Sequence, residues 1–352
     1  MTYRLIEGDG LTVLGTLLPV YKNRVRCVYI DPPYNTGHPL AYADSRPSGA
    51  WATMMRERLT LVRDLLDQAG SVWISIDDNE LPSLRIIADS LFDRVATVVW
   101  EKRVNRENRS TFSQAHEYVL VYARDAAAFK KSRHKLSAPQ LRTAYKNPDG
   151  DPRGPWQPVP LTVQAGHAAT SQFYTYTTPS GRAVTPPPGR AWAVTLPRLK
   201  DLEASGALWF GAKGTAQPVR KRYLESSALE LTPSTLWPAS EVGDNASARS
   251  ELIHLMDGDA RFDTPKPVQL VQRILQIATD KDSLVLDFFA GSGTTAEAVV
   301  RLNASDGGTR GCILAQSSEL FSDGSGKIFD YMVERVCRVA PKDTVEVFRA
   351  GA

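Results

Sequence analysis

The stretch LVLDFFAGSGTTAEAV, residues 284–299, predicts an apolar strand, a tight glycine-rich turn and the start of a helix. Gly291 and Gly293 stand at the turn, where a missing Cβ permits backbone angles and a close ligand approach that other residues block. The turn is not a phosphate-binding P-loop, because no Lys follows the second glycine, and Ala296 replaces the third glycine of a dinucleotide-binding turn. Asp287 ends the strand and can face a cationic ligand, since a buried acid is otherwise costly. A plain strand-to-helix turn is the alternative.

Strand and helix patterns alternate on both sides of this stretch. The segments 51–67 and 268–278 predict helices. Apolar runs predict strands in VRCVYI (25–30), SVWISID (71–77), VATVVW (95–100), EYVLVYA (117–123) and GCILAQ (311–316). Such alternation indicates a largely parallel sheet with helices on both faces.

Length and composition exclude several classes of protein. The 352 residues can form two domains, or one large domain with an insertion. No apolar run is long enough to cross a bilayer, and MTYRLIEGDG lacks the features of a signal peptide, so we expect a cytoplasmic protein with no membrane partner. Three distant cysteines and five scattered histidines indicate neither a disulfide framework nor a metal site.

The middle of the chain differs in charge and composition. Residues 102–222 contain 20 Lys and Arg against 7 Asp and Glu, a balance of 20 − 7 = +13, whereas the remainder has 22 against 32, or −10. Ten of the 23 prolines lie between Pro148 and Pro197, and TSQFYTYTT (170–178) predicts a short strand. A basic block suits a polyphosphate partner because Lys and Arg displace its counterions, although a solubilising surface is the alternative.

The strand VRCVYI leads directly into Asp31-Pro32-Pro33-Tyr34. Successive prolines fix the backbone, remove two N–H donors and leave carbonyl groups pointing outward. Asp31 and the Pro32 carbonyl can accept hydrogen bonds from an exocyclic amino group, and Tyr34 can stack on a planar ring. A rigid surface turn in which the Asp caps the strand is the alternative.

These motifs resemble those of amino-methyltransferases of DNA, specifically the β-class adenine-N6 enzymes, which include the modification subunits of type III restriction systems. Asp31 to Tyr34, continued by Asn35-Thr36-Gly37, resembles the catalytic motif, and residues 287–295, DFFAGSGTT, resemble the S-adenosylmethionine loop. The catalytic motif precedes the cofactor loop, with a long insertion between them, as in the β class. The resemblance implies S-adenosylmethionine as cofactor and double-stranded DNA as partner.

Further segments are similar to the family. Gly8-Asp9 resembles the acidic turn near the cofactor adenine, and Thr264-Pro265-Lys266-Pro267 resembles the motif that flanks the cofactor. Residues 58–77 and His116-Glu117-Tyr118 match the segments after the catalytic motif. The second cofactor strand leaves open whether Gln316 or Glu319 meets the ribose hydroxyls. The cofactor-binding residues that the resemblance implies are Asp9, Thr264, Lys266, Asp287, Phe289, Gly291, Gly293, Thr294, Gln316 and Glu319.

The resemblance also implies the architecture. We expect an α/β, doubly wound, mainly parallel Rossmann-like methyltransferase sheet, circularly permuted, with an irregular target-recognition module inserted. Residues 1–124 form its catalytic half, 125–261 the module and 262–352 its cofactor-binding half. The arm KRVNRENR (102–109) has no apolar face and is expected to line the DNA cleft. Its DNA-binding residues would be Lys102, Arg103, Arg106 and Arg109.

The implied activity is site-specific methylation of the N6 amino group of a flipped adenine in duplex DNA, a displacement that needs no metal. By resemblance, the catalytic residues are Asp31, Pro32, Pro33 and Tyr34. The closest alternative is a cytosine-N4 methyltransferase, although that subgroup more often has Ser in place of Asp31. A catalytically silent DNA-binding subunit of a restriction assembly is another. A homodimer and a separate restriction subunit are partners that the sequence leaves open.

Overall fold

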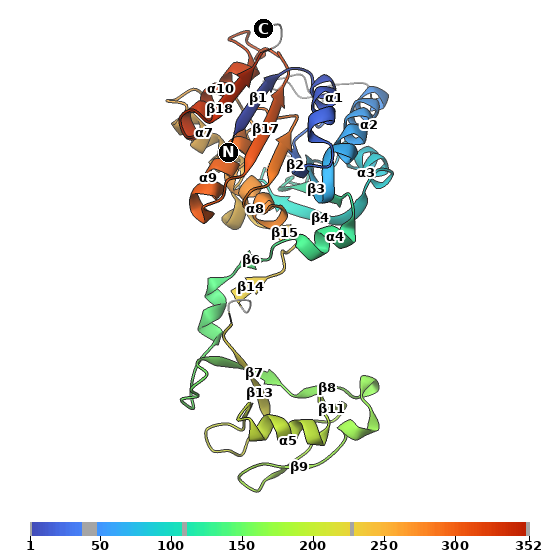
Figure 1. Cartoon of the computed structure of the whole chain (residues 1–352), viewed down its shortest axis with the longest axis vertical. Helices are drawn as coiled ribbons and strands as arrows, with labels where there is room; N and C mark the ends of the chain where they lie inside the picture. The colour runs from blue at the N-terminus through green and yellow to red at the C-terminus, as the bar shows by residue number, and fades with distance from the viewer. Residues whose placement is uncertain (1, 37–47, 108–110, 226–228, 350–352) are drawn as a thin grey trace. The chain divides into compact units, whose positions relative to one another are not determined.

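The chain forms two compact units (Figure 1). The first combines Met1–His134 with Pro233–Ala352, and the second is Lys135–Thr232. The computed structural model describes residues 2–36, 48–107, 111–225 and 229–349. Over these residues, none of the helices has the length and apolar character needed to span a membrane.

A nine-stranded sheet forms the centre of the first unit, in the order β15-β4-β5-β3-β2-β16-β17-β1-β18. Strand β5 runs antiparallel to β3 and β4, and the other neighbouring strands pair in parallel. The carboxyl ends of the parallel strands therefore meet at one edge. The strands are β1 (Tyr3–Glu7), β2 (Val25–Ile30), β3 (Leu66–Ile76), β4 (Asp93–Glu101), β5 (His116–Ala123), β15 (Leu236–Trp237), β16 (Leu284–Asp287), β17 (Gly311–Gln316) and β18 (Val345–Phe348).

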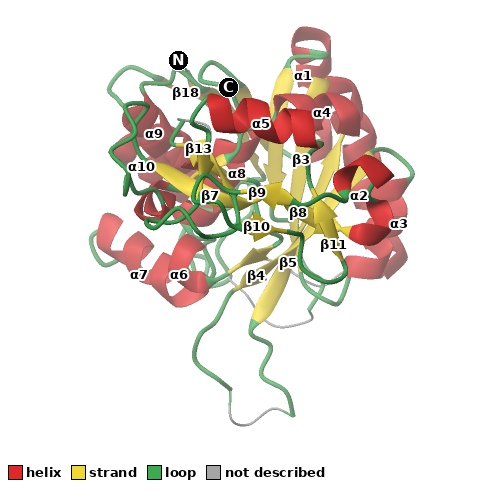
Figure 2. Cartoon of the chain, turned by 90° about the horizontal axis from the view of Figure 1, so that it is seen from below, coloured by secondary structure: helices red, strands yellow, loops and turns green. Residues whose placement is uncertain are grey.

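Helices cover both faces of this sheet (Figures 1 and 2). One face carries α1 (Gly10–Tyr21), α2 (Ser48–Leu65) and α3 (Leu81–Asp89), and the other carries α8 (Val268–Ala278), α9 (Thr294–Asp306) and α10 (Ile328–Val339). All six residues of β2 are buried. A strand covered on both faces is mostly apolar, which explains why VRCVYI does not alternate strictly with polar residues. Its one charged residue, Arg26, donates to the Ala278 carbonyl and lies 3.4 Å from Asp67.

The strand order reverses between the neighbouring parallel strands β2 and β16. From β2 the chain continues to β3 on one side, and from β16 it continues to β17 on the other. Ligands bind at such a switch point, beyond the carboxyl ends of the strands. Asp31 directly follows β2, and Asp287 is the last residue of β16. The fold thus brings together two acids that are 256 positions apart by their numbers, 287 − 31.

The second unit is built from short elements. Its small core combines Leu161, Tyr176, Val184, Trp192, Leu199, Leu202 and Leu208. Within the expected strand 170–178, only β9 (Tyr176–Thr177) is a strand, and a 3₁₀ turn, Thr170–Gln172, precedes it. The other elements are β6 (Leu136–Ser137), β7 (Trp156–Pro160), β8 (Thr162–Gln164), β10 (Ala183–Val184), β11 (Arg190–Trp192), α5 (Leu196–Ala204), β12 (Leu208–Trp209), β13 (Val219–Tyr223) and β14 (Glu230–Leu231), with 3₁₀ turns at Pro139–Ala144 and Ala165–His167.

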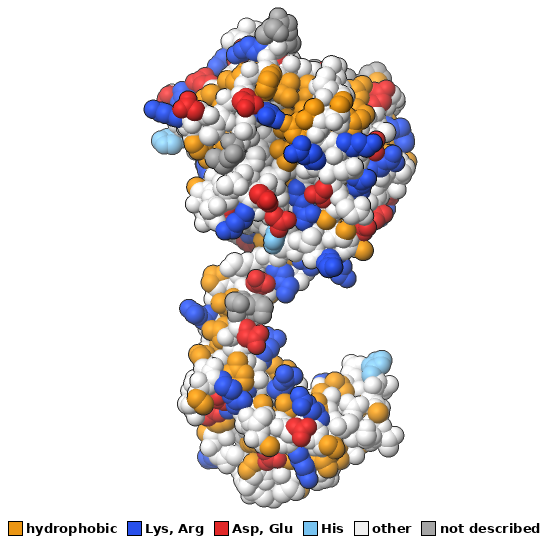
Figure 3. All heavy atoms as spheres, viewed as in Figure 1, with side chains coloured by type: hydrophobic (Ala, Val, Ile, Leu, Met, Phe, Trp, Pro, Cys, Tyr) orange, Lys and Arg blue, Asp and Glu red, His pale blue; other side chains and the backbone are white. Residues whose placement is uncertain are grey.

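A buried carboxylate holds the second unit together. Asp151 accepts hydrogen bonds from Arg153 Nε at 2.9 Å, Lys221 Nζ at 2.7 Å and the Tyr223 hydroxyl at 2.7 Å. Arg153 and Lys221 hold the pKa of Asp151 far below its usual value. Some of the basic side chains of residues 102–222 are therefore committed to internal pairs. On the face that Figure 3 displays, Lys and Arg lie among Asp and Glu.

The second unit, Lys135–Thr232, covers a shorter stretch of the chain than the module expected at 125–261. Helix α4 (Ala126–Ser132) belongs to the first unit, where Phe129 makes an edge contact with Trp73. Strand β15 pairs with β4, and its Trp237 stacks on Trp73 with the ring centroids 6.3 Å apart. Helices α6 (Ala239–Val242) and α7 (Asn245–Leu255) follow in the same unit. Composition did not mark these boundaries because they depend on contacts with strands distant in sequence.

We expect Trp237→Ala to lower the free energy of unfolding of the first unit by about 3–5 kcal/mol, because it removes a large side chain from a packed site. Trp237 is 1% exposed, whereas its neighbour Leu236 is 63% exposed, so Leu236→Ala is the matched control. Denaturant unfolding followed by circular dichroism measures the loss. A Trp237 variant as stable as the parent would show that β15 does not stabilise the first unit.

Candidate active site

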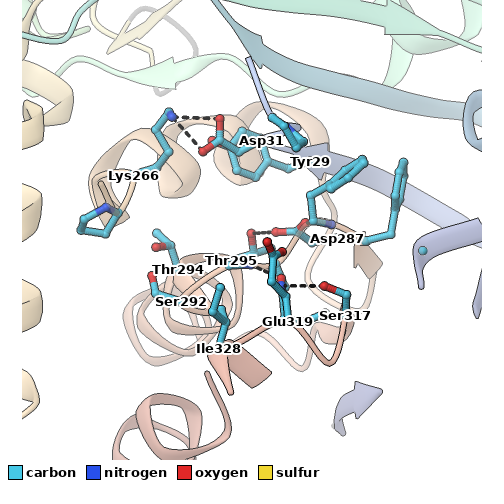
Figure 4. A pocket seen from close by; sticks show the side chains of 18 of the residues that line it. Tyr29, Asp31, Lys266, Asp287, Ser292, Thr294, Thr295, Ser317, Glu319 and Ile328 are labelled. Carbon is cyan, nitrogen blue, oxygen red and sulfur yellow. Dashed lines mark hydrogen bonds and ion pairs between the residues drawn. The ribbon is translucent and has the colours of Figure 1, made fainter. Parts of the chain in front are cut away.

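A pocket opens at the switch point, beyond the carboxyl ends of β1, β2, β16 and β17 (Figure 4). The empty space within it, including open solvent at its mouth, is about 1030 Å³. The residues implied by resemblance that line it are Asp9, Asp31, Pro33, Thr264, Lys266, Asp287, Phe289, Gly291, Thr294, Gln316 and Glu319.

The glycine-rich turn needs its glycines for two different reasons. Gly291 and Gly293 have φ angles of 53° and 84°, in the left-handed region that favours glycine. A Cβ on Gly291 would lie 3.2 Å from the ring of Phe262, which also lines the pocket, whereas a Cβ on Gly293 would lie 3.0 Å from Met332 in α10. Gly291 therefore shapes the pocket, and Gly293 allows α10 to pack closely.

A buried ion pair, not anticipated from the sequence, clamps this turn. Arg335 in α10 contacts Glu297 in α9 through Nε at 2.9 Å and Nη2 at 2.8 Å. Its Nη1 donates to the hydroxyl of Ser292 at 2.7 Å and to that of Thr294 at 2.9 Å. These contacts tie the glycine-rich turn to α9 and α10. The available signal was a Glu among the small and apolar residues of the helix that follows the turn.

Asp287 lies at the floor of the pocket and is 3% exposed. It accepts hydrogen bonds from the Thr295 hydroxyl at 2.5 Å and from the Phe289 N–H at 3.0 Å. Burial raises the pKa of Asp287 to about 7, although these two hydrogen bonds oppose the rise. A cation in the pocket would favour the ionised form.

Asp9 and Arg58 form another part of the lining. Asp9 caps α1 by accepting from the Leu11 N–H at 2.9 Å, and its other oxygen lies 2.5 Å from Arg58 Nη2. The Arg58 guanidinium also lies over the Phe289 ring, 5.9 Å from its centroid. Within the described part of the chain, no hydrogen-bond acceptor reaches the buried Arg58 Nε. The sequence matched Arg58 to the family but assigned it no role.

Both candidates for the ribose contact, Gln316 and Glu319, line the pocket. Gln316 Oε1 accepts the Gly291 N–H at 2.9 Å, so this oxygen stabilises the glycine-rich turn. The Glu319 main-chain carbonyl accepts from Ile328, which orients the residue beside the pocket. Figure 4 shows the Glu319 side chain extending towards the pocket from the segment after β17.

The Asp-Pro-Pro-Tyr turn is held by contacts with three other elements. Trp51 in α2 donates to the Pro33 carbonyl at 2.7 Å, and the Tyr34 hydroxyl donates to Glu117 Oε2 in β5 at 3.1 Å. Both Asp31 oxygens lie 2.8 Å from Lys266 Nζ (Figure 4). Over the described residues, no donor occupies the Pro32 carbonyl.

Lys266 is thus a partner of the Asp-Pro-Pro-Tyr turn as well as a lining residue of the pocket. Its ammonium lies 4.9 Å from the centroid of the Tyr34 ring and 3.7 Å from Glu117 Oε2. Burial raises the pKa of Asp31, and the Lys266 ammonium opposes this rise. Burial also acts on Glu117, but Lys266 and Lys102 outweigh it and hold the pKa of Glu117 below its usual value.

The residues expected to bind DNA are not equivalent. Lys102 lies next to the site, with Nζ 3.1 Å from Glu117 Oε1. Arg103 is half exposed and lies 3.7 Å from Glu107, and Arg106 is exposed. Both belong to the β4–β5 connection, which projects from the sheet in Figure 2. Arg109, like Gly37 after the catalytic turn, lies outside the described residues.

A glycine-rich turn and an Asp-Pro-Pro-Tyr turn thus open into one pocket of a mainly parallel sheet. The chain belongs to the DNA methylase family, which it matches over residues 25–319. This family covers both adenine-N6 and cytosine-N4 enzymes, and its cofactor is S-adenosylmethionine. The fold class expected from the sequence is confirmed.

Known relatives include subunits of restriction-modification enzymes. The chain is 35% identical to the Mod subunit of the type III enzyme StyLTI from Salmonella typhimurium, over 96% of this chain and 57% of that protein. It is 29% identical to the Mod subunit of the type III enzyme EcoPI of Escherichia phage P1, over 97% and 62%. It is also 29% identical to the type II methyltransferase M.KpnI from Klebsiella pneumoniae, over 94% and 85%. The chain thus spans about three fifths of the length of the first two.

Solved structures share the fold. TTHA0409 from Thermus thermophilus, described as a DNA modification methylase, superposes with a TM-score of 0.50 at 16% identity, over 98% of this chain and 99% of the other. The cytosine-N4-specific PvuII DNA methyltransferase gives a TM-score of 0.50 at 12% identity, over 97% and 88%. At these identities the likeness concerns the fold alone.

The raised pKa of Asp287 predicts a specific pH dependence of stability. Between its ordinary value of 3.8 and its value in the fold, about 7, the folded protein keeps a proton that the unfolded chain has lost. Stability therefore falls as the pH rises through this window, by about 1.4 kcal/mol per pH unit at most.

Asp287→Asn abolishes this titration, and its side-chain oxygen can still accept from Phe289. We expect the free energy of unfolding of the parent to fall relative to that of the variant as the pH rises from about 4 to about 7. Denaturant titrations at several pH values measure the difference. If the difference between the two proteins does not change with pH, Asp287 is not the titrating group.

Proposed function

We propose that this chain transfers the methyl group of S-adenosylmethionine to the N6 amino group of a flipped adenine in duplex DNA. One observation carries the proposal: the Asp31 turn and the glycine-rich turn open into the same pocket from neighbouring strand ends. A methyl donor held beside β16 would lie next to an amino acceptor held beside β2. Placing the reactants in this way supplies much of the rate in a direct displacement.

The residues of the pocket fit the cofactor. Asp287 is a buried acid that a cation would stabilise, and Arg58 Nε is a buried donor without a partner in the described residues. We assign the ribose contact to Glu319, because its side chain extends towards the pocket and a carboxylate can accept hydrogen bonds from two hydroxyl groups. When bound, S-adenosylmethionine supplies the methyl group on a positively charged sulfur.

The catalytic turn would act on the target amino group. Asp31 and the Pro32 carbonyl can accept its two N–H bonds and so favour the positive charge that develops on nitrogen. The reaction replaces one N–H bond by N–CH₃ and releases a proton, for which Asp31 is a nearby base. Tyr34 can stack on the flipped base and offset part of the cost of unstacking it, a few kcal/mol.

Cytosine-N4 methylation is the second candidate, because cytosine presents the same exocyclic amino group and the family includes both activities. The Asp at position 31 favours adenine by resemblance. A silent DNA-binding subunit would not need this combination of catalytic turn and open pocket.

The relatives' names suggest the setting. Two are Mod subunits of type III restriction-modification enzymes. We propose that this chain is the modification component of such a system in the cytoplasm and that it acts with a separate restriction subunit. We also propose that it forms a homodimer, which light scattering tests. We also propose that Lys135–Thr232 is the target-recognition module.

The methylation assay uses the purified chain, labelled S-adenosylmethionine and genomic duplex DNA, followed by mass spectrometry of the nucleosides. We expect N6-methyladenine. Asp31→Ala and Asp31→Asn should each lower the rate by at least about 10²-fold, because they remove stabilisation of the transition state. Cofactor affinity, measured by calorimetry, should persist. N4-methylcytosine as product would favour the second candidate, and a variant as fast as the parent would remove Asp31 from the mechanism.

The arm is tested through the salt dependence of DNA affinity. Replacing Arg103 and Arg106 together by Ala should make the log–log slope shallower by about two units if both contact phosphates, or relax site preference if either contacts a guanine edge. Affinity is measured on a cognate and a scrambled duplex. A matched double variant at Arg63 and Lys281, exposed at the opposite edge of the sheet, should behave like the parent. If the Arg103 and Arg106 variant also behaves like the parent, the arm does not bind DNA.

A further inference from the structure

Four charged groups of alternating sign connect the DNA arm to the catalytic turn. In order they are Lys102, Glu117, Lys266 and Asp31, with successive N to O distances of 3.1, 3.7 and 2.8 Å. Their side chains are only 17%, 7%, 9% and 22% exposed. Pairs this well buried interact more strongly than surface ion pairs, and none of the four charges can be left without a partner cheaply.

The contact at one end of this series opposes the proposed reaction. Both Asp31 oxygens are engaged by Lys266, so the target amino group would have to share each oxygen with the ammonium. An ammonium on Asp31 would also repel the positive charge that develops on the amino nitrogen. Methyl transfer is therefore favoured when Lys266 leaves Asp31, and the lysine then needs another carboxylate.

Glu117 is that carboxylate. Its Oε2 already lies 3.7 Å from Lys266 Nζ, so a small movement of the lysine end is sufficient. Its Oε1 is meanwhile held by Lys102, the first residue after β4 and the start of the arm that carries Arg103 and Arg106.

We propose that DNA binding exposes Asp31 by an exchange of partners along this series. DNA phosphates take Lys102, Glu117 takes Lys266, and Asp31 becomes free for the target amino group. Every charge keeps a partner of opposite sign throughout. Glu117 is a positioning residue, since it acts through Lys266 and does not touch the target. The inference rests on the proposed function and adds to it a coupling between DNA contact and catalysis.

Glu117→Gln, Lys266→Met and the double variant test the exchange. Without a negative charge at position 117, Lys266 should stay on Asp31, and kcat should fall at least about 10-fold. Removing Lys266 as well should free Asp31, so the double variant should be at least about 3-fold faster than Glu117→Gln alone. If both substitutions merely damaged the structure, their effects on kcat would add, and the double variant would be slower than Glu117→Gln. Adding Lys281→Met to Glu117→Gln is the matched control and should give no gain.

The assay conditions must keep Asp31 ionised. The charged or titratable groups that act on Asp31 or its neighbours are Lys266, Glu117, Tyr34, Tyr29 and Asp287. Loss of Lys266 removes the group that opposes the raised pKa of Asp31, so the acid limb of the rate profile should move to higher pH in Lys266→Met. The comparison is therefore made on the alkaline plateau, at saturating cofactor, after calorimetry has established cofactor binding for each variant.

The role of Lys102 in this exchange is tested separately, by the salt dependence of DNA binding. If Lys102 moves from Glu117 to a phosphate, Lys102→Met should make the salt slope of DNA binding shallower by about one unit, whereas Lys281→Met should not. An unchanged slope for Lys102→Met overturns the coupling to DNA.

The outcomes separate this inference from the proposed function. A parent that methylates DNA and loses activity with Asp31→Ala supports the function, and a double variant then no faster than Glu117→Gln overturns the exchange alone. A parent that methylates no amino group overturns both.

Discussion

The site depends on burying two carboxylates at neighbouring strand ends of a parallel sheet. Asp31 after β2 and Asp287 at the end of β16 lie where the chain direction changes, the place at which a parallel sheet leaves a crevice. Buried charges need partners, and the two acids find them differently. Burial raises the pKa of both acids, but Lys266 opposes the rise at Asp31, whereas among the described residues Asp287 has neutral donors and its pKa rises to about 7. A cation in the pocket would favour the ionised form of Asp287.

The rest of the first unit keeps these groups in place. Arg335 and Glu297 fix the glycine-rich turn from below, and Trp51 and Glu117 fix the catalytic turn from α2 and β5. These supports come from four elements that are distant in sequence. Such preorganisation is what a positioning mechanism requires, because the chemistry itself needs no metal and no covalent intermediate.

The structure shows that part of the positive charge of residues 102–222 is neutralised by internal ion pairs. Arg153 and Lys221 of the second unit neutralise the buried Asp151, and Lys102 neutralises Glu117 in the first unit. The summed charge of residues 102–222 therefore overstates what is free to meet phosphates. Lys102 combines the two uses in the exchange proposed above, in which its internal ion pair with Glu117 is replaced by a phosphate contact.

The sequence by itself determined the sheet type, because glycine-rich turns, proline pairs and apolar runs impose their local geometry without help from distant residues. The resemblance of its motifs indicated the family and about half of the pocket lining, 11 of its 23 residues. Helix α8 and strands β2 and β17 match the expected segments in full. Only the tertiary structure decided that Lys266 and Lys102 join the ion pairs beside the Asp-Pro-Pro-Tyr turn, that Arg335 clamps the glycine-rich turn, and that the inserted unit ends at Thr232. Ion pairs and packing between separate elements leave no local pattern, since each partner alone has the composition of an ordinary helix, strand or loop.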